Sequence, residues 1–487
     1  MTATSPEFRF WVDMALECVR RDHTQTISAG DQRGPFLSSR ALGLALGALH
    51  DMAARGWGGP QLLSVAPPVA PGPHELAAAA ACHQVLTRRF PKQQGLLASA
   101  WAEWQELYKR TGAGAEAAGR AYGDAVEALG VNDPDNAMRD RYTATGADYT
   151  HQRPEHEPTQ IYAGGDWGMS TALLVPIVTG FARPFGRQNG GTVVSDPDHR
   201  ADFEHVKTKG HWSRTYGGPN GRTAEEELIG IYWGYDGPAH LGTPPRLYLQ
   251  VLLTVLDDLE ARTAGALGVS DELLLIGGAA VAMADAAISA WHYKYSADHM
   301  MWRPVVSVRM EKGLNGVADP DWLPLGRPDT NGTGLYLTPD FPAYPSGHAT
   351  FGAAAFELAR LFLAEKGLAT FDARGVDDIR FDFVSDEFNG RNEDPRTRQP
   401  RTPITRGYGS LWDAIVDNSI SRVFLGVHWQ FDGISLKAGT GSKFGVPKAP
   451  DELGDVGGVW LGVQIARAVA TQKLGVTPGT VLNSKMP

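Results

Sequence analysis

The sequence is poor in cysteine and in long apolar runs. Cys18 and Cys82 are the only cysteines among 487 residues. Two cysteines in helical-looking segments exclude a disulfide-rich scaffold and a cysteine-rich metal centre, so we interpret both as buried small hydrophobic residues. The best apolar run, residues 273–284, is too short to cross a bilayer, and the N-terminus lacks a signal-like basic and apolar pattern. We therefore expect a soluble, cytoplasmic protein with no membrane partner.

Positive charge is also in short supply. The net charge is −10 and the calculated isoelectric point is near 5.8. This balance argues against nucleic acid or an anionic membrane as the main partner, although an acidic exterior can still enclose a basic pocket. With 43% hydrophobic residues, the chain has enough material for a large core.

Apolar residues recur at the spacing of a helix along much of the chain, whereas the alternation typical of strands is scarce. The predicted helices are residues 38–55, 73–90, 95–110, 116–130, 223–233, 244–263, 271–295, 349–366, 408–427 and 455–474. We predict a mainly α fold of two packed helical bundles with long connecting loops. The expected division is an N-terminal bundle at 1–185, connecting loops at 186–230 and a C-terminal bundle at 231–487.

The most informative stretch is Phe341–His348, where a turn rich in proline and glycine leads directly into an apolar helix. A helix N-terminus of this kind presents free backbone N–H groups and favours a bound anion. Ser346 adds a hydroxyl group, Gly347 permits close approach of the backbone, and His348 can exchange protons near neutral pH. The stretch predicts a tetrahedral-oxyanion site, although a simple helix start capped by Ser346 is equally compatible with it.

Two further groups of residues carry similar chemistry. Arg422 offers a planar set of donors, and Asp432 follows His428 by four positions, where it can accept one ring N–H and leave the other nitrogen with a free lone pair. Upstream, Lys294 and Arg303 come at the end of a long apolar helix. Each group also has a structural reading, as a His–Asp pair or as cations that complement a helix dipole.

In this order, Lys294, Arg303-Pro304, Pro345-Ser346-Gly347-His348 and Ser421-Arg422 with His428 and Asp432 resemble the vanadium-dependent haloperoxidases and the related type-2 phosphatidic acid phosphatases. The resemblance covers residues 294–432 and includes the six-residue interval from Arg422 to His428. It implies a haloperoxidase that uses hydrogen peroxide to oxidise halide to hypohalous acid, which then halogenates a small organic substrate. A homo-oligomer is the default for large bacterial relatives.

The resemblance also implies a role for each residue. His428 would bind vanadium, with Asp432 behind it, and His348 would act as the acid–base residue. The vanadate oxygens would be held by Lys294, Arg303, Ser346, the Gly347 N–H and Arg422, and phosphate or sulfate can occupy the same site. Phe341 and Trp302 would border the halide and peroxide pocket, and each is also compatible with a plain core position.

One spacing departs from the family. The lysine usually precedes the arginine by seven positions, but Lys294 precedes Arg303 by nine. In a continuous helix, nine steps would place the two side chains about half a turn apart. Either the helix ends early and two extra residues among Ser296–Trp302 loop out, which we favour, or Ser296 or His299 has taken the place of the lysine.

Two other functions use the same residues. An acid phosphatase would employ His428 as the nucleophile and His348 as the acid for the leaving group, and the altered lysine spacing is compatible with it. A non-catalytic helical protein that retains an anion pocket is the third reading. The haloperoxidase is favoured because the chain is long and has two halves.

Overall fold

The fold is mainly α-helical. The computed structural model describes residues 5–28, 30–134 and 142–487, so the first four residues of the N-terminal segment considered above lie outside the described part. The helices and strands are α1 (Pro6–Asp22), α2 (Pro35–Trp57), α3 (His74–Arg89), α4 (Gln94–Tyr108), α5 (Ala113–Glu127), α6 (Pro197–Lys209), α7 (Ala224–Tyr232), α8 (Pro244–Arg262), α9 (Val269–Lys294), α10 (Pro304–Met310), α11 (Gly347–Glu365), β1 (Phe381–Val384), β2 (Thr405–Tyr408), α12 (Leu411–Phe424), α13 (Gln430–Gly433), α14 (Gly458–Lys473) and α15 (Pro478–Asn483). β1 and β2 form an antiparallel pair in which Phe381 lies opposite Tyr408.

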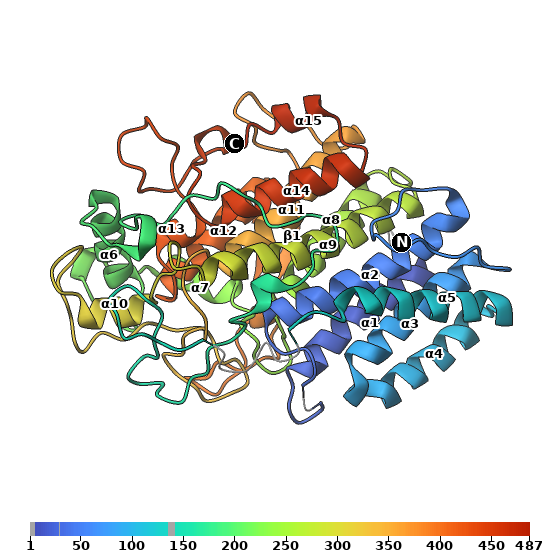
Figure 1. Ribbon diagram of the computed structural model, residues 1–487, viewed down its shortest axis with the longest axis horizontal. Helices are drawn as coiled ribbons and strands as arrows, with labels where there is room; N and C mark the ends of the chain where they lie inside the picture. Colours follow the sequence, from blue (N-terminus) through green and yellow to red (C-terminus); the bar gives the residue numbers. More distant parts are fainter. Residues whose placement is uncertain (1–4, 29, 135–141) are drawn as a thin grey trace.

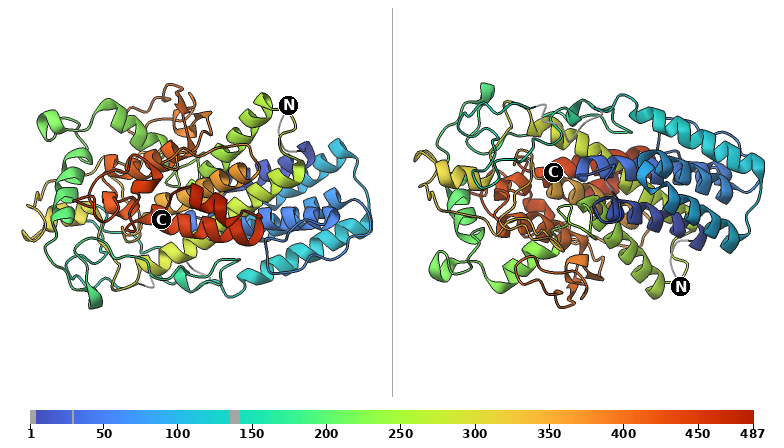
Figure 2. Two further views of the ribbon diagram at one scale, coloured as in Figure 1. Left: turned by 90° about the horizontal axis from the view of Figure 1, so that it is seen from above. Right: turned by 90° about the horizontal axis from the view of Figure 1, so that it is seen from below.

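The helices are arranged along one long axis (Figure 1). Helices α1 to α5 gather at one end, α6 and α10 lie at the other, and α8, α9, α11 and α14 run through the middle, an arrangement that Figure 2 confirms from above and below. The N-terminal helices join the rest of the molecule mainly through α2, which packs along α9. The hydrophobic core is continuous across this junction.

Small residues allow α2 and α9 to approach closely. A Cβ atom added to Gly43 of α2 would lie 2.8 Å from the Ala284 Cβ atom of α9, and one added to Gly277 would lie 3.2 Å from the Leu46 carbonyl oxygen. Helix α9 is long and apolar enough to cross a membrane by length and composition, but its most apolar window is 100% buried inside the protein. It is therefore the central core helix of this fold.

A single carboxylate in α9 fastens a long loop to the core. Asp285 is fully buried and accepts backbone N–H groups from Leu173, Leu174 and Val175 at 2.6, 2.9 and 2.7 Å. Burial raises the pKa of Asp285 to about 6, and these N–H groups act in the opposite direction. The loop that follows the N-terminal helices is thus held against the core although it contains little regular structure.

Each helix predicted above is present, with ends that shift by a few residues. The sequence pattern missed α1, α6, α10, α13, α15 and the two strands, and the stretch 186–230, expected to be connecting loops, contains α6 and most of α7. Helix α6 escaped detection because Phe203 and Val206 are its only buried hydrophobic residues. Cys18 and Cys82 are buried and free, as predicted.

Candidate functional site

The start of α11 forms the floor of the site. Ser346 is the N-cap residue, and its hydroxyl accepts the Ala349 N–H at 3.5 Å, so the capping role expected of this serine is present. The Ser346 N–H donates to the Asp432 carbonyl at 2.8 Å, which ties α11 to α13. Gly458 of α14 lies against the same point, because a Cβ atom added there would be 2.5 Å from the Ser346 carbonyl oxygen. The floor is therefore fixed by two other helices.

His428 lies between the carboxylate of Asp432 and the guanidinium group of Arg303. Its Nδ1 atom is 2.9 Å from Asp432 Oδ2, which also accepts the Trp429 N–H at 2.9 Å. Burial, and then the charge of Arg303, lowers the pKa of His428 well below its usual value, so the ring is neutral. With the Nδ1 proton directed to Asp432, Nε2 carries the lone pair, and Arg303 Nη1 donates to it at 2.9 Å.

Arg303 is completely buried at the N-cap of α10. Its other hydrogen bonds go to backbone carbonyls, from Nη1 to Val427 at 2.7 Å and from Nε to Phe341 at 2.8 Å. No ion pair of Arg303 with a carboxylate is present among the described residues. The positive charge is therefore fixed in place and left uncancelled by direct contact.

Lys294 is the last residue of α9, so the helix ends before the two extra positions in the sequence. Its amine donates to the carbonyls of Pro342 at 2.8 Å, Ala343 at 3.2 Å and Pro345 at 2.5 Å. Burial lowers the pKa of Lys294 well below its usual value, and Arg303 lowers it further. The amine thus lies beneath the turn that carries Ser346, within electrostatic reach of Arg303 and Arg422.

The two residues considered as substitutes for Lys294 lie elsewhere. Ser296 Oγ is 3.4 Å from His299 Nδ1, and His299 Nε2 is 3.2 Å from the Phe181 carbonyl. His299 also stacks on Phe181 and packs against Tyr293. Ser296 is therefore engaged with His299, and His299 with Phe181 and Tyr293.

Arg422 extends from α12 toward the same space and forms a bidentate ion pair with Asp236. The two Arg422 Nη atoms are 2.9 and 2.7 Å from the Asp236 carboxylate oxygens. Burial would raise the pKa of Asp236, but Arg422, His348 and Arg327 together outweigh burial, and the pKa is lowered. Sequence reasoning missed Asp236 because a lone aspartate before glycine, with Tyr235 at φ 42° and Gly237 at φ 88°, is typical of an ordinary turn.

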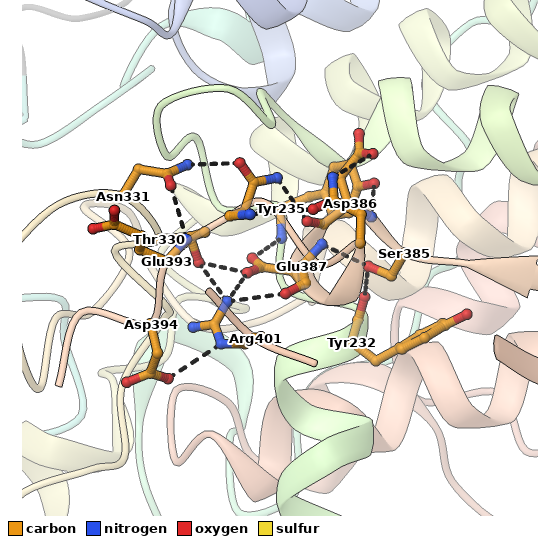
Figure 3. Close-up of polar contacts among 12 residues, drawn as sticks. Tyr232, Tyr235, Thr330, Asn331, Ser385, Asp386, Glu387, Glu393, Asp394 and Arg401 are labelled. Atoms are coloured by element: carbon orange, nitrogen blue, oxygen red, sulfur yellow. Dashed lines mark hydrogen bonds and ion pairs between the residues drawn. The ribbon is translucent and has the colours of Figure 1, made fainter. Parts of the chain in front are cut away.

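Tyr235, which precedes Asp236 in the chain, belongs to a buried polar network (Figure 3). Glu387 accepts hydrogen bonds from Arg401 and from Thr330, both at 2.5 Å, and its other oxygen is 3.4 Å from the Tyr235 N–H. The Tyr235 hydroxyl in turn accepts the Asp386 N–H at 2.8 Å. The segment that carries Asp236 is therefore anchored to loops that are more than ninety residues away in sequence.

His348 has one ring nitrogen occupied and the other available. Its Nε2 atom donates to the Gly234 carbonyl at 2.6 Å. Burial, and then the charge of Arg422, lowers the pKa of His348 to about 3, so the ring is neutral at ordinary pH. Its own carbonyl accepts from Tyr248 and Asn418 at 3.0 and 2.8 Å. Nδ1 is then the basic nitrogen of a well-positioned imidazole.

A cavity leads from the surface to these groups. Its lining includes Phe341, Gly347, His348, Arg422 and His428. The Phe341 ring lies 5.1 Å from both the Lys294 amine and the Arg303 guanidinium carbon, so it packs against the two cations at the cavity wall.

Trp302, expected at the halide and peroxide pocket, does not line this cavity. It is 1% exposed and packs on Tyr149 with ring centroids 4.5 Å apart, while its carbonyl accepts the Trp429 Nε1–H at 3.1 Å. Its side chain therefore turns into the core because Arg303, next to it in the chain, turns toward His428.

The residues present fit a tetrahedral oxyanion such as vanadate. Arg422 Nε is buried and has no hydrogen-bond partner among the described residues, although its two Nη atoms are satisfied by Asp236. Around it are the neutral His428 and two buried cations, Lys294 and Arg303, that bind only neutral acceptors. Buried donors without a carboxylate partner favour a negatively charged ligand.

Fold and site together define a helical-bundle protein with an oxyanion site around a His–Asp pair. Residues 275–445 match the family model "VCPO second helical-bundle domain". The chain is 28% identical to the vanadium chloroperoxidase of Curvularia inaequalis, over 96% of this chain and 90% of that protein. Residues 275–445 therefore carry the helical-bundle domain that this model describes, and the chain as a whole is similar to a vanadium chloroperoxidase.

Solved structures agree on the fold. A bacterial vanadium-dependent iodoperoxidase superposes with a TM-score of 0.65 at 18% identity, covering 95% of this chain and 96% of its own. The holo form of a bacterial vanadium-dependent chloroperoxidase superposes with a TM-score of 0.56 at 14% identity, covering 93% and 94%. The helical architecture therefore extends over almost the whole chain.

Proposed function

We propose that the protein is a vanadate-dependent haloperoxidase that uses hydrogen peroxide to oxidise halide and thereby halogenates small organic molecules. The observation that carries the proposal is the Nε2 lone pair of His428, which accepts from Arg303 in a site where the buried Lys294 and Arg303 donate to neutral groups alone. Such an arrangement suits a metal oxyanion that needs one nitrogen ligand and several donors to oxygen. When bound, vanadate supplies the chemistry that activates peroxide toward halide.

Different residues of this chain would bind the vanadium and the vanadate oxygens. His428 would bind vanadium through Nε2, because Asp432 fixes the proton on Nδ1. Lys294, Arg303, Ser346, Gly347 and Arg422 would hold the oxygens. Arg303 would then transfer its hydrogen bond from His428 to the ligand, and Arg422 would add its free Nε–H.

His348 would move the proton. Its Nε2–H is committed to the Gly234 carbonyl, so Nδ1 can accept a proton from peroxide at the cavity wall. Once protonated, the imidazolium would face Asp236, whose charge acts on it already. The ion pair of Arg422 and Asp236 would thus lie beside the His348 imidazole in both its neutral and its protonated state.

The decisive experiment starts from protein stripped of bound anions. With orthovanadate, hydrogen peroxide and bromide it should brominate a phenol-sulfonate indicator, and it should do nothing when vanadate is left out. Turnover of p-nitrophenyl phosphate without vanadate, together with no bromination in its presence, would instead identify a phosphatase with His428 as nucleophile. Inactivity in both assays would support a non-catalytic anion-binding protein.

A matched pair of variants tests the ligand assignment. His428→Ala should abolish vanadate binding in equilibrium dialysis and reduce bromination at least about a thousandfold, since the ligand that anchors the ion is lost. His292→Ala, which removes an exposed histidine near the end of α9, should leave both unchanged. Vanadate retained by His428→Ala would overturn the assignment.

We further propose a domain division at 1–185, 186–230 and 231–487, and a cytoplasmic homo-oligomer that does not bind a membrane. The two unpaired, buried thiols fit a reducing compartment. Light scattering of the purified protein would measure the oligomeric state directly.

A further inference from the structure

The outer part of the catalytic cavity is built partly by the N-terminal half of the chain. Arg33, Gly34 and Pro35 line it together with Arg327 and Asp340 from the C-terminal half. The N-terminal loop is pinned to the end of α1, because the Asp22 carboxylate accepts the N–H groups of Asp31 and Gln32 at 2.7 and 2.6 Å. His23 Nε2 also accepts the Gly34 N–H at 3.2 Å. The cavity mouth is therefore an ordered part of the molecule.

Charge at this mouth is unbalanced. Arg422 and Asp236 neutralise each other deeper in the cavity, which leaves Arg33 and Arg327 against the single carboxylate of Asp340. The whole chain has a net charge of −10, so a positive mouth is a local exception to its overall charge. An anion entering the cavity would be attracted at this point.

The hydrogen-bonding capacity of the two arginines is largely unused. The Arg327 side chain donates to the Asp236 carbonyl at 3.4 Å, a weak bond, and makes no other hydrogen bond in the described part of the chain. Arg33 is exposed, and none of the described residues accepts a hydrogen bond from it. Asp340 and Arg327 attract each other electrostatically but do not approach within ion-pair distance. Two forked donors therefore remain free to bind a carboxylate.

The space beside these charges is larger and more apolar than an inorganic ion needs. The cavity has a volume of about 130 Å³, enough for several water molecules, and Pro35, Pro244, Pro339 and Phe351 contribute apolar walls. Apolar walls with a few polar groups are typical of sites for small organic molecules. A halide ion would leave most of this surface unfilled.

We propose that the cavity mouth is a binding subsite for the organic substrate, selective for small molecules in which an apolar or aromatic body carries a carboxylate. Arg327 and Arg33 bind the carboxylate, and the body extends inward past Phe341 toward the oxidising centre. The proposal rests on the haloperoxidase function proposed above, because it assigns the molecule that the oxidised halogen meets. Bound in this way, the substrate is halogenated inside the cavity.

Binding is measured first, by calorimetry on vanadate-loaded protein without peroxide or halide, so that the vanadate site itself is filled. The probes are 3-(4-hydroxyphenyl)propanoate and its uncharged amide. The acid should bind at least about tenfold more tightly than the amide. Arg327→Gln should weaken the acid about tenfold and Arg33→Gln about threefold, because Arg33 is exposed. Equal affinity for acid and amide would overturn the proposal.

Control variants distinguish the loss of a positive charge from disruption of the local structure. Arg327→Lys keeps a cation and should recover part of the preference for the acid, whereas a loss caused by misplacing Asp236 would persist in it. Arg55→Gln removes an exposed arginine at the end of α2 and should change neither probe. Displacement of the acid by bromide at turnover concentrations would assign the mouth to halide and overturn the organic subsite.

Oxidation of iodide to triiodide, which needs no organic substrate, distinguishes failure of this inference from failure of the proposed function. Absence of triiodide would refute the haloperoxidase. Formation of triiodide with equal bromination rates for the acid and the amide would refute only the substrate subsite. The expected result is triiodide formation together with a kcat/KM ratio of acid to amide that falls in Arg327→Gln.

Discussion

Two groups of buried cations in this molecule have different kinds of partner. Arg360 in α11 is completely buried between two buried carboxylates, Glu357 and Asp377. Lys294 and Arg303 are buried just as completely, but they bind backbone carbonyls and the neutral ring of His428. Taking a cation out of water costs several kcal/mol, and a carboxylate is the usual compensation. A cation whose partners are all neutral can still attract a bound anion. This difference in partners distinguishes the cations of the candidate site from Arg360.

The largest effect is expected where a compensated cation is removed. Arg360→Met should lower the free energy of unfolding by about 4 kcal/mol, because it leaves Glu357 and Asp377 buried without their partner. Urea unfolding followed by circular dichroism would measure it. Vanadate affinity of the folded fraction should be unchanged, since Arg360 lies away from the cavity; a large loss of affinity would contradict the distinction.

A buried carboxyl group without a cation should appear in the pH dependence of stability. Burial raises the pKa of Asp202 in α6 to about 7, against backbone bonds that include the Phe431 N–H at 3.1 Å. The folded state then retains a proton that the unfolded chain loses near pH 4. The contribution of Asp202 to stability is therefore greatest at low pH and decreases as the pH rises to 7, by about 3 kcal/mol between pH 4.5 and 7.

Asp202→Asn should remove this slope, because the amide oxygen can still accept the Phe431 N–H but does not titrate. Urea unfolding of both proteins at pH 4.5 and 7 would measure the difference. A slope that is identical in the two proteins would show that Asp202 does not carry the proton.

Removing an uncompensated cation should affect binding more than folding. Lys294→Met should weaken orthovanadate binding about thirtyfold, or about 2 kcal/mol, because a charge-assisted hydrogen bond is lost. The free energy of unfolding should change by less than about 1 kcal/mol, since the desolvation cost of the amine disappears together with its three carbonyl bonds. Equilibrium dialysis and urea unfolding test the two halves of this prediction, and a change in stability alone would contradict it.

Sequence patterns predicted the helical architecture because most helices bury an apolar face that repeats every three or four residues. They failed for α6, whose only buried hydrophobic residues are Phe203 and Val206. The three groups of site residues follow from motif order, whereas Asp236 lies in a turn about sixty residues upstream of the first group and contacts Arg422 only in the folded chain. Whether Lys294 reached the site depended on where α9 ends, which spacing alone leaves open.

The smallest effect is expected from variants that shift the charged groups of the site without removing them. They test whether vanadate affinity depends on the position of these charges as well as on their presence. Gly458→Ala would place a methyl group 2.5 Å from the Ser346 carbonyl oxygen, and Gly462→Ala would place one 2.3 Å from the Thr350 carbonyl oxygen, one turn further along the same contact. Both should lower the free energy of unfolding by about 1.5 kcal/mol, because α14 must move away from α11. Only Gly458→Ala displaces the turn that holds Ser346 and accepts from Lys294, so it should weaken vanadate binding several-fold more than Gly462→Ala. Equal losses of affinity in calorimetry would mean that the site tolerates movement of its floor and that charge alone sets the affinity.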